Sequence, residues 1–308
     1  MLPNIKPSKK VIYLDHAATT PLDPRVRKTM EPFWSDYFGN PSSLYKKGRE
    51  GTNAITKGRQ AIAKILNSKP DEILFTAGGS ESINLAILGI ARQYRLSHKE
   101  GGHIIASAIE HHAVLHCLDA LKQEGFETSL IDVDDNGFIK QKDLKNSLRP
   151  DTILISIMYA NNEIGTILPI AEIGKWLRQT NELRIKNNES RIIFHTDACQ
   201  AAGALDLNVE KLGIDLLSAN GSKIYGPKQT GFLYAKSGIR LRPLIFGGGQ
   251  EKNLRSGTEN VPGIVGLAEA LRLAQKENLK ENKRLIKLRD YFIDQLFEKV
   301  PKIVLNGH

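Results

Sequence analysis

One lysine of this sequence lies in a segment of small and turn-forming residues. Lys223 is part of SANGSKIYGPK at 218–228, which leaves its side chain little freedom to extend into solvent. This neighbourhood favours a fixed role over an ordinary surface charge. A lysine amine held away from water can form a Schiff base with an aldehyde, so the segment indicates carbonyl chemistry.

An acidic residue and a glycine-rich turn could complete such a site. Asp197 ends an apolar run in HTDACQ, and a carboxylate buried there needs a cation or a donor, for which a protonated pyridine nitrogen would serve. The turn TAGGSES at 76–82 precedes a helical pattern, where main-chain N–H groups and the helix N-terminus favour a phosphate. Each feature alone is common as a plain strand end or turn. Together they predict a site for pyridoxal 5'-phosphate.

The elements that must position these residues alternate along the chain. The alternation is typical of βαβ units around a mainly parallel sheet, so the predicted fold class is α/β. In such a sheet ligands bind where strands end, which would bring Asp197 and Lys223 to one edge. Helical patterns are expected to begin near Ser80, His111, Lys142 and Ile170, and a long one runs from Ile264 to about Lys299. Strands are predicted at 72–75, 103–107, 128–133, 152–158, 191–198, 214–219, 231–236 and 241–246, with a last strand-like segment at 302–306.

Composition places the chain among ordinary globular proteins. Its 308 residues are 41% apolar and 25% charged, and the formal net charge is +9. No apolar run approaches the roughly 18 residues of a transmembrane helix, and the N-terminus lacks the apolar core of a signal peptide, so no membrane association and a cytoplasmic location are expected. The basic segment 276–289 lacks interleaved aromatic residues, and nucleic-acid binding is therefore not expected. Cys117 and Cys199 are interpreted as small buried side chains.

Two alternative metal sites are weaker interpretations. The run DVDDNGFIKQKD at 132–143 has several residues of a calcium loop, but a strand-like segment precedes it and the last position is Asp, which favours a turn from strand to helix. His112 and His116 have the spacing of zinc ligands on a helix, but no carboxylate completes the pattern. No metal is predicted.

The order of the motifs carries a family resemblance over nearly the whole chain. The motifs are YLDHAATTPLDPRV, FGNPSS, ILFTAGGSESINLAI, IEHHAVL, MYANNEIG, HTDACQ, GSKIYGPK, GGGQE and LRSGTEN. This sequence resembles the cysteine desulfurases of the NifS and IscS type, in the class V aminotransferase superfamily. The resemblance implies fold type I: a large domain with a mainly parallel seven-stranded sheet between helices at 17–262, and an incomplete small α+β domain formed by an N-terminal arm at 1–16 and by 263–308.

The resemblance also implies an activity and its partners. A pyridoxal phosphate enzyme of this kind converts L-cysteine to L-alanine and passes the sulfur as persulfide to an iron–sulfur scaffold or to thionucleoside assembly. The resemblance also implies a homodimer. By position, Lys223 would bind the cofactor aldehyde and act in catalysis with His111, which would also stack on the ring. The remaining cofactor contacts would come from Gly79, Ser80, Asn162, Asp197, Gln200, Asn220 and Ser222, and from Thr258 of the other subunit.

The sequence departs from the family pattern in two places. Asn220 and Ser222 stand where the family has Ser and His, and because both can still donate hydrogen bonds, a rearranged cofactor contact is expected. The sequence also ends before the loop of the family's persulfide-forming cysteine and the arginine that binds the substrate carboxylate. Two alternatives therefore stay open: a catalytically incomplete cofactor-binding subunit that needs a separate C-terminal piece, and another class V aminotransferase or lyase.

Overall fold

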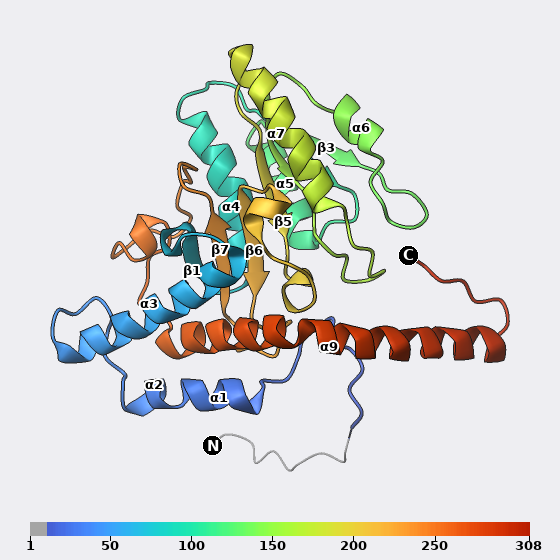
Figure 1. Cartoon of the computed structure of the whole chain (residues 1–308). Helices are drawn as coiled ribbons and strands as arrows, with labels where there is room; N and C mark the ends of the chain where they lie inside the picture. The colour runs from blue at the N-terminus through green and yellow to red at the C-terminus, as the bar shows by residue number, and fades with distance from the viewer. Residues whose placement is uncertain (1–10) are drawn as a thin grey trace.

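The computed structural model describes residues 11–308, which form a seven-stranded sheet with helices on both faces (Figure 1). The strand order is β1-β7-β6-β5-β4-β2-β3. Strand β7 runs antiparallel to β1 and β6, and the other neighbouring pairs are parallel. The predicted mainly parallel α/β sheet is therefore confirmed. Its strands are β1 (Ile73–Thr76), β2 (His103–Ser107), β3 (Glu127–Ile131), β4 (Thr152–Ser156), β5 (Ile193–Asp197), β6 (Leu216–Asn220) and β7 (Gly231–Ala235).

Alternation of side chains along the strands builds one apolar core on each face of the sheet. In β2, for example, Ile104 belongs to one core and Ile105 to the other. Helices α4 (Gly79–Arg95) and α5 (His112–Gln123) cover the first core, and α3 (Lys46–Leu66), α7 (Ile170–Lys186) and the start of α9 (Val261–Lys299) cover the second. Both faces of the sheet are thus buried, as expected for strands joined by helical crossovers. The short helices are α1 (Pro24–Met30), α2 (Pro32–Ser35), α6 (Gln141–Asn146) and α8 (Val209–Leu212).

The predicted helix starts agree with the structure within three residues. The long helix α9 begins at Val261, slightly before the expected Ile264, because the side chain of Asn260 caps it by accepting from Gly263 N and Pro262 suits the first turn. The helix runs without a break past residue 263, and its second half extends beyond the sheet (Figure 1). The division into domains at residues 16 and 262 stays a prediction, and residues 1–10 of the N-terminal arm lie outside the described chain.

Two strand predictions are wrong. Residues 241–246 form no strand: Pro243 lacks an N–H group, Arg242 N instead donates to Gly89 O, and one isolated bridge joins Ile245 to Arg255. Residues 302–306 are likewise without strand pairing in the described chain, because no neighbouring strand offers them a ladder of hydrogen bonds.

The run at 132–143 is a turn from strand to helix, as predicted. It connects β3 to α6, and Asp134 Oδ1 accepts hydrogen bonds from Asn136 N and Phe138 N at 3.0 and 2.9 Å. Cys117 and Cys199 are both buried, as expected. Within residues 11–308, no helix has the length and apolar character needed to cross a membrane.

Candidate active site

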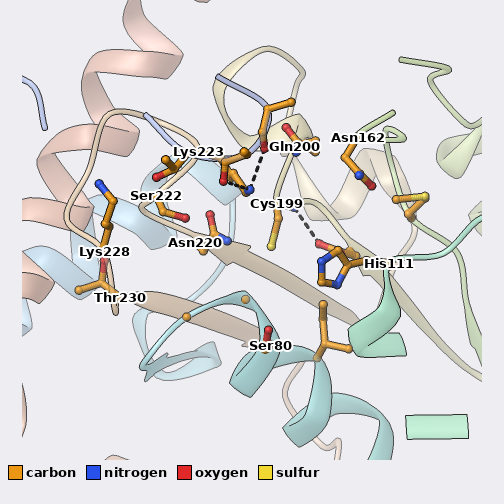
Figure 2. Close-up of a pocket in the computed structure, with 18 of the residues that line it drawn as sticks. Ser80, His111, Asn162, Cys199, Gln200, Asn220, Ser222, Lys223, Lys228 and Thr230 are labelled. Atoms are coloured by element: carbon orange, nitrogen blue, oxygen red, sulfur yellow. Dashed lines mark hydrogen bonds between the residues drawn. The ribbon is translucent and has the colours of Figure 1, made fainter. Parts of the chain in front are cut away.

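A cavity of about 850 Å³ opens at the carboxyl ends of the central strands. All of the predicted site residues except Thr258 line it, and Figure 2 shows most of them around this one space. The sheet explains the convergence, because β2, β4, β5 and β6 are parallel and end at the same edge. Those lining residues are Gly79, Ser80, His111, Asn162, Asp197, Gln200, Asn220, Ser222 and Lys223.

Lys223 is half-buried and holds a crossing segment of the chain. Its Nζ donates to the main-chain oxygens of Ala17 and Ala18 at 2.7 and 2.5 Å (Figure 2). Gln200 Nε2 donates to Ala17 O as well, at 3.0 Å. Thr20 adds a third anchor, since its N–H and hydroxyl both donate to Ser222 O, at 2.9 and 3.0 Å. Residues 17–20 therefore pass along the cavity wall and contact the amine that the sequence singled out.

Asp197 ends β5 as a buried carboxylate. Its Oδ1 accepts from Cys199 N at 2.9 Å, and its side chain faces the cavity. Burial raises the pKa of Asp197, while the Cys199 N–H group and the nearby His111 and Lys223 lower it. A cation bound in the cavity would stabilise the ionised form of Asp197.

The start of α4 forms the floor of the cavity where a phosphate was predicted. Gly78 has φ +147°, a backbone conformation that favours glycine. A Cβ added to Gly79 would lie 2.6 Å from Cys199 Sγ and 3.0 Å from Asn220 Nδ2, so a larger residue would have to displace these side chains. The turn is held by Glu81, which accepts from Ala77 N at 2.8 Å and pairs with Arg255 at 2.9 Å. Main-chain N–H groups at this helix start suit an anion.

His111 and Asn162 reach the cavity from loops after β2 and β4. His111 caps α5, because its Nδ1 accepts from Ala113 N at 3.0 Å, and this bond orients the ring. Asn162 lies in a turn that Asn161 holds by accepting from the N–H groups of Glu163 and Ile164, at 2.8 and 2.9 Å. Both side chains are therefore carried on loops with a defined conformation.

Thr258 lies outside the main cavity of its own chain. It lines a smaller cavity of about 190 Å³, which is next to the main one because Gln229 and Thr230 line both. Within one chain, Thr258 therefore does not line the same cavity as the other predicted cofactor-binding residues. The resemblance assigned it to the site of a second subunit, and that assignment stays a prediction.

Several lining residues were missed by the sequence analysis. They are Asp15, Thr19, Glu163, Cys199, Lys228 and Thr230. The segments YLDHAATT and GPKQT contain four of them, but nothing in their local pattern shows that they meet at one site. Burial raises the pKa of the Cys199 thiol well above its usual value, so this thiol stays protonated.

Within the part of the chain that the structure describes, two buried oxygen atoms of the cavity wall have no hydrogen-bond partner. They are Thr19 Oγ1 and Asn220 Oδ1. Buried polar atoms without partners are costly, so these groups favour a polar ligand in the cavity. The threonine hydroxyl can donate, and the asparagine amide can turn to present its N–H groups. The donors near Gly79, the amine of Lys223 and the buried Asp197 carboxylate fit the phosphate, aldehyde and pyridine nitrogen of pyridoxal phosphate.

Comparison with known proteins agrees with this fit. Residues 12–308 match the family described as Aminotransferase class-V. Cysteine desulfurase IscS of Dictyoglomus turgidum is 50% identical over 299 residues, which cover 97% of this chain and 73% of the relative. A solved NifS-like protein has a TM-score of 0.88 and 38% identity, over 93% of this chain and 76% of its own. The structure described as SspA in complex with cysteine has a TM-score of 0.78 and 42% identity, over 84% and 72%.

The fold and the site thus define a class V aminotransferase, a class of proteins that depends on pyridoxal 5'-phosphate. Within this class, the chain belongs to the cysteine desulfurase family of the IscS and NifS type.

Proposed function

We propose that this chain is a pyridoxal phosphate-dependent cysteine desulfurase that converts L-cysteine to L-alanine and passes the sulfur to an acceptor thiol, which becomes a persulfide. The observation that carries the proposal is the convergence of Lys223, Asp197 and Gly79 on one cavity, from three elements far apart in sequence. The named relatives support the same activity and favour it over another aminotransferase or lyase reaction.

The residues have distinct proposed roles around the cofactor, which supplies an electron sink when bound. Lys223 is the amine that binds the aldehyde carbon and moves a proton at the substrate Cα. Asp197 holds a negative charge beside the pyridine nitrogen and keeps it protonated. His111 packs its ring on the flat face of the pyridine, and Gln200 donates to the ring oxygen.

The remaining roles concern the phosphate and the substrate. The N–H groups at Gly79 and Ser80 bind the phosphate together with the side chains of Asn220 and Ser222, in place of the family's Ser and His. Asn162 orients the substrate carboxylate and the ring oxygen of the cofactor. All these side chains line the cavity, which supports the assignment.

We also propose a homodimer in which Thr258 of a second copy reaches the phosphate. A cavity of about 280 Å³ joins the Thr258 loop to an aromatic surface that includes the exposed Trp34 and Phe38. An apolar surface next to an incomplete site suits a second copy of the chain. The sulfur would pass to an iron–sulfur scaffold or another acceptor protein in the cytoplasm.

One assay tests the activity. The purified chain is mixed with pyridoxal phosphate, L-cysteine and excess dithiothreitol, whose thiols accept the sulfur and supply the two electrons that sulfide release needs. Absorbance of the bound cofactor, sulfide and alanine are measured against free cofactor. We expect sulfide and alanine in equal amounts from the wild type and from Lys211→Ala, an exposed lysine on α8, but none above background from Lys223→Ala. Transamination of other amino acids without sulfide release would contradict the proposal.

A further inference from the structure

A buried glutamate beside the active site has no role among those proposed for cofactor and substrate binding. Glu110 directly precedes His111 and is only 5% exposed. Its Oε1 accepts from Ser107 Oγ at 2.6 Å and from Met158 N at 2.7 Å. Its Oε2 is buried and has no hydrogen-bond partner among residues 11–308. Neither partner of Oε1 is a cation, so nothing in these contacts compensates a negative charge.

Glu110 joins two loops that carry cavity residues. Ser107 ends β2, and Met158 follows β4, so the one carboxyl group connects the loop of residues 108–111 to the loop of residues 157–164. A second bond runs in parallel, from Asn161 Nδ2 to Ile109 O at 3.0 Å. These two loops carry His111 and Asn162. Their relative position therefore depends on Glu110 and Asn161.

The surroundings of Glu110 favour the protonated acid. An ionised carboxylate with a buried oxygen lacking any donor would be costly, whereas a neutral carboxyl group leaves at most one O–H without a partner. Asp197, at the end of β5, is a charged side chain close enough to disfavour a second negative charge. Burial and, to a lesser extent, the charge of Asp197 raise the pKa of Glu110 to about 8, although the bonds from Ser107 and Met158 act to lower it.

We propose that Glu110 is a positioning residue that keeps its proton, ties the His111 loop to the Asn162 loop, and leaves Asp197 as the carboxylate that meets the cofactor. The effect of Glu110 on His111 and Asp197 at the cofactor site rests on the proposed function. The protonation of Glu110 is independent of that function, and it is measured without any cofactor.

The first experiment compares the unfolding of wild type and Glu110→Gln in urea from about pH 5 to pH 9. Gln keeps the acceptor for Met158 N and Ser107 but cannot ionise. With a folded-state pKa above the usual 4.5, Glu110 stabilises the fold fully at low pH, and this stability is lost as pH rises to about 8. The ratio of the wild-type to the variant unfolding constant should therefore rise about tenfold per pH unit up to about pH 8 and then level off.

Glu72→Gln is the matched control. Glu72 is also buried, but both of its oxygens accept main-chain N–H groups, from Lys69 and Ser237, at 2.9 and 2.8 Å. Burial opposes ionisation of Glu72, but these bonds leave its pKa below the usual value. The ratio of the wild-type to the Glu72→Gln unfolding constant should therefore be constant over the same pH range. A constant ratio for Glu110→Gln would contradict a protonated Glu110. Near neutral pH the wild-type infrared spectrum should also show the C=O band of a protonated carboxyl group, and Glu110→Gln should lack it. No such difference between the two spectra would likewise contradict a protonated Glu110.

The second experiment measures the Kd for pyridoxal phosphate by absorbance at about pH 7. Glu110→Gln should bind within about threefold of wild type, and Glu110→Ala, which loses both contacts of Oε1, at least about tenfold more weakly, equivalent to about 1.4 kcal/mol. Because Gln keeps the contacts of Glu110 but cannot ionise, normal affinity in Glu110→Gln would show that the contacts matter and a negative charge does not. Equal affinity of Glu110→Ala and wild type would overturn the positioning role. A wild-type chain that binds no cofactor would contradict the proposed function instead, while the unfolding series would still decide the state of Glu110.

Discussion

The amine of Lys223 lies 2.7 Å from the main-chain oxygen of Ala17, a residue 206 positions earlier in the chain. The same amine contacts Ala18 O. Because an imine nitrogen has at most one N–H, at least one of these two bonds would be released on binding an aldehyde. Charge-assisted bonds of this kind each contribute about 1.5–3 kcal/mol. The segment of residues 17–20 is therefore coupled to the chemical state of Lys223.

We expect pyridoxal phosphate to speed amide hydrogen exchange at Ala18 by roughly tenfold, because the loss of Lys223 bonds to the segment would loosen the turn in which Ala18 N donates to Asp15 O. Thr20 should change little, because its N–H donates to Ser222 O. Lys223→Ala should show the fast exchange without cofactor, and Lys211→Ala should not. Mass spectrometry of the peptides near residue 17 gives the measurement. Slower exchange on adding cofactor would show that the coupling has the opposite sign.

Asp197→Asn should weaken cofactor binding by about two to four orders of magnitude, because a buried cation that loses its charged partner costs about 3–5 kcal/mol. Since burial raises the pKa of Asp197, the same change should not destabilise the cofactor-free fold. Asp215→Asn is the matched control: Asp215 is buried but pairs with Arg191 and accepts from Phe194 N. It should lower stability and leave cofactor affinity unchanged. Absorbance titration and urea unfolding separate the two effects.

Gly79→Ala should destabilise the fold by about 1–3 kcal/mol, the usual cost of overpacking, although alanine is the better helix former. The added Cβ would meet Cys199 Sγ at 2.6 Å. Cys199→Ala in the same chain removes that sulfur and should restore most of the loss. Asn220 Nδ2, at 3.0 Å from the same Cβ, leaves the recovery incomplete. The four unfolding free energies form a double-mutant cycle, and additive effects would exclude this contact as the cause.

His195 should make the fold sensitive to acid. It is buried between Ser156 Oγ and Ser218 Oγ, at 2.8 and 2.9 Å, and burial lowers its pKa to about 3. Because the unfolded chain takes up a proton near pH 6.5 and the folded chain does not, stability present above pH 6.5 is lost as pH falls towards 3. His195→Gln should flatten this pH dependence, whatever its effect at neutral pH. His116→Gln, on the exposed side of α5, should leave the slope of the urea unfolding series unchanged.

Mixing two inactive variants tests the proposed role of Thr258. Thr258→Ala and Lys223→Ala homodimers should each be impaired. If Thr258 serves the partner's site, a mixed dimer has one complete site, formed by Lys223 of one chain and Thr258 of the other. Exchange of subunits should then restore up to half of the wild-type sulfide release per mixed dimer. No recovery in a mixture shown by native mass spectrometry to contain mixed dimers would place Thr258 at its own site or at none.

Local sequence patterns were sufficient for most elements of the fold. Strands β1 to β7 and the starts of α4, α5, α6 and α7 follow from apolar periodicity and turn residues, which act over a few positions. The failures at 241–246 and 302–306 share a cause. Both segments are apolar enough for a strand, but a strand also needs a neighbour, and the neighbour is chosen by the whole chain.

The sequence by itself determined the α/β class, the family and the kinds of side chain that could hold pyridoxal phosphate, because these depend on residue types in a fixed order. Only the tertiary structure decided that β7 lies between β1 and β6 and that Gly79 lies against Asn220 and Cys199. It alone brought Ala17 to Lys223 and closed the carboxyl of Glu110 off from water between two loops. Strand order and burial result from contacts between segments that are distant in sequence, and a local sequence pattern cannot predict such contacts.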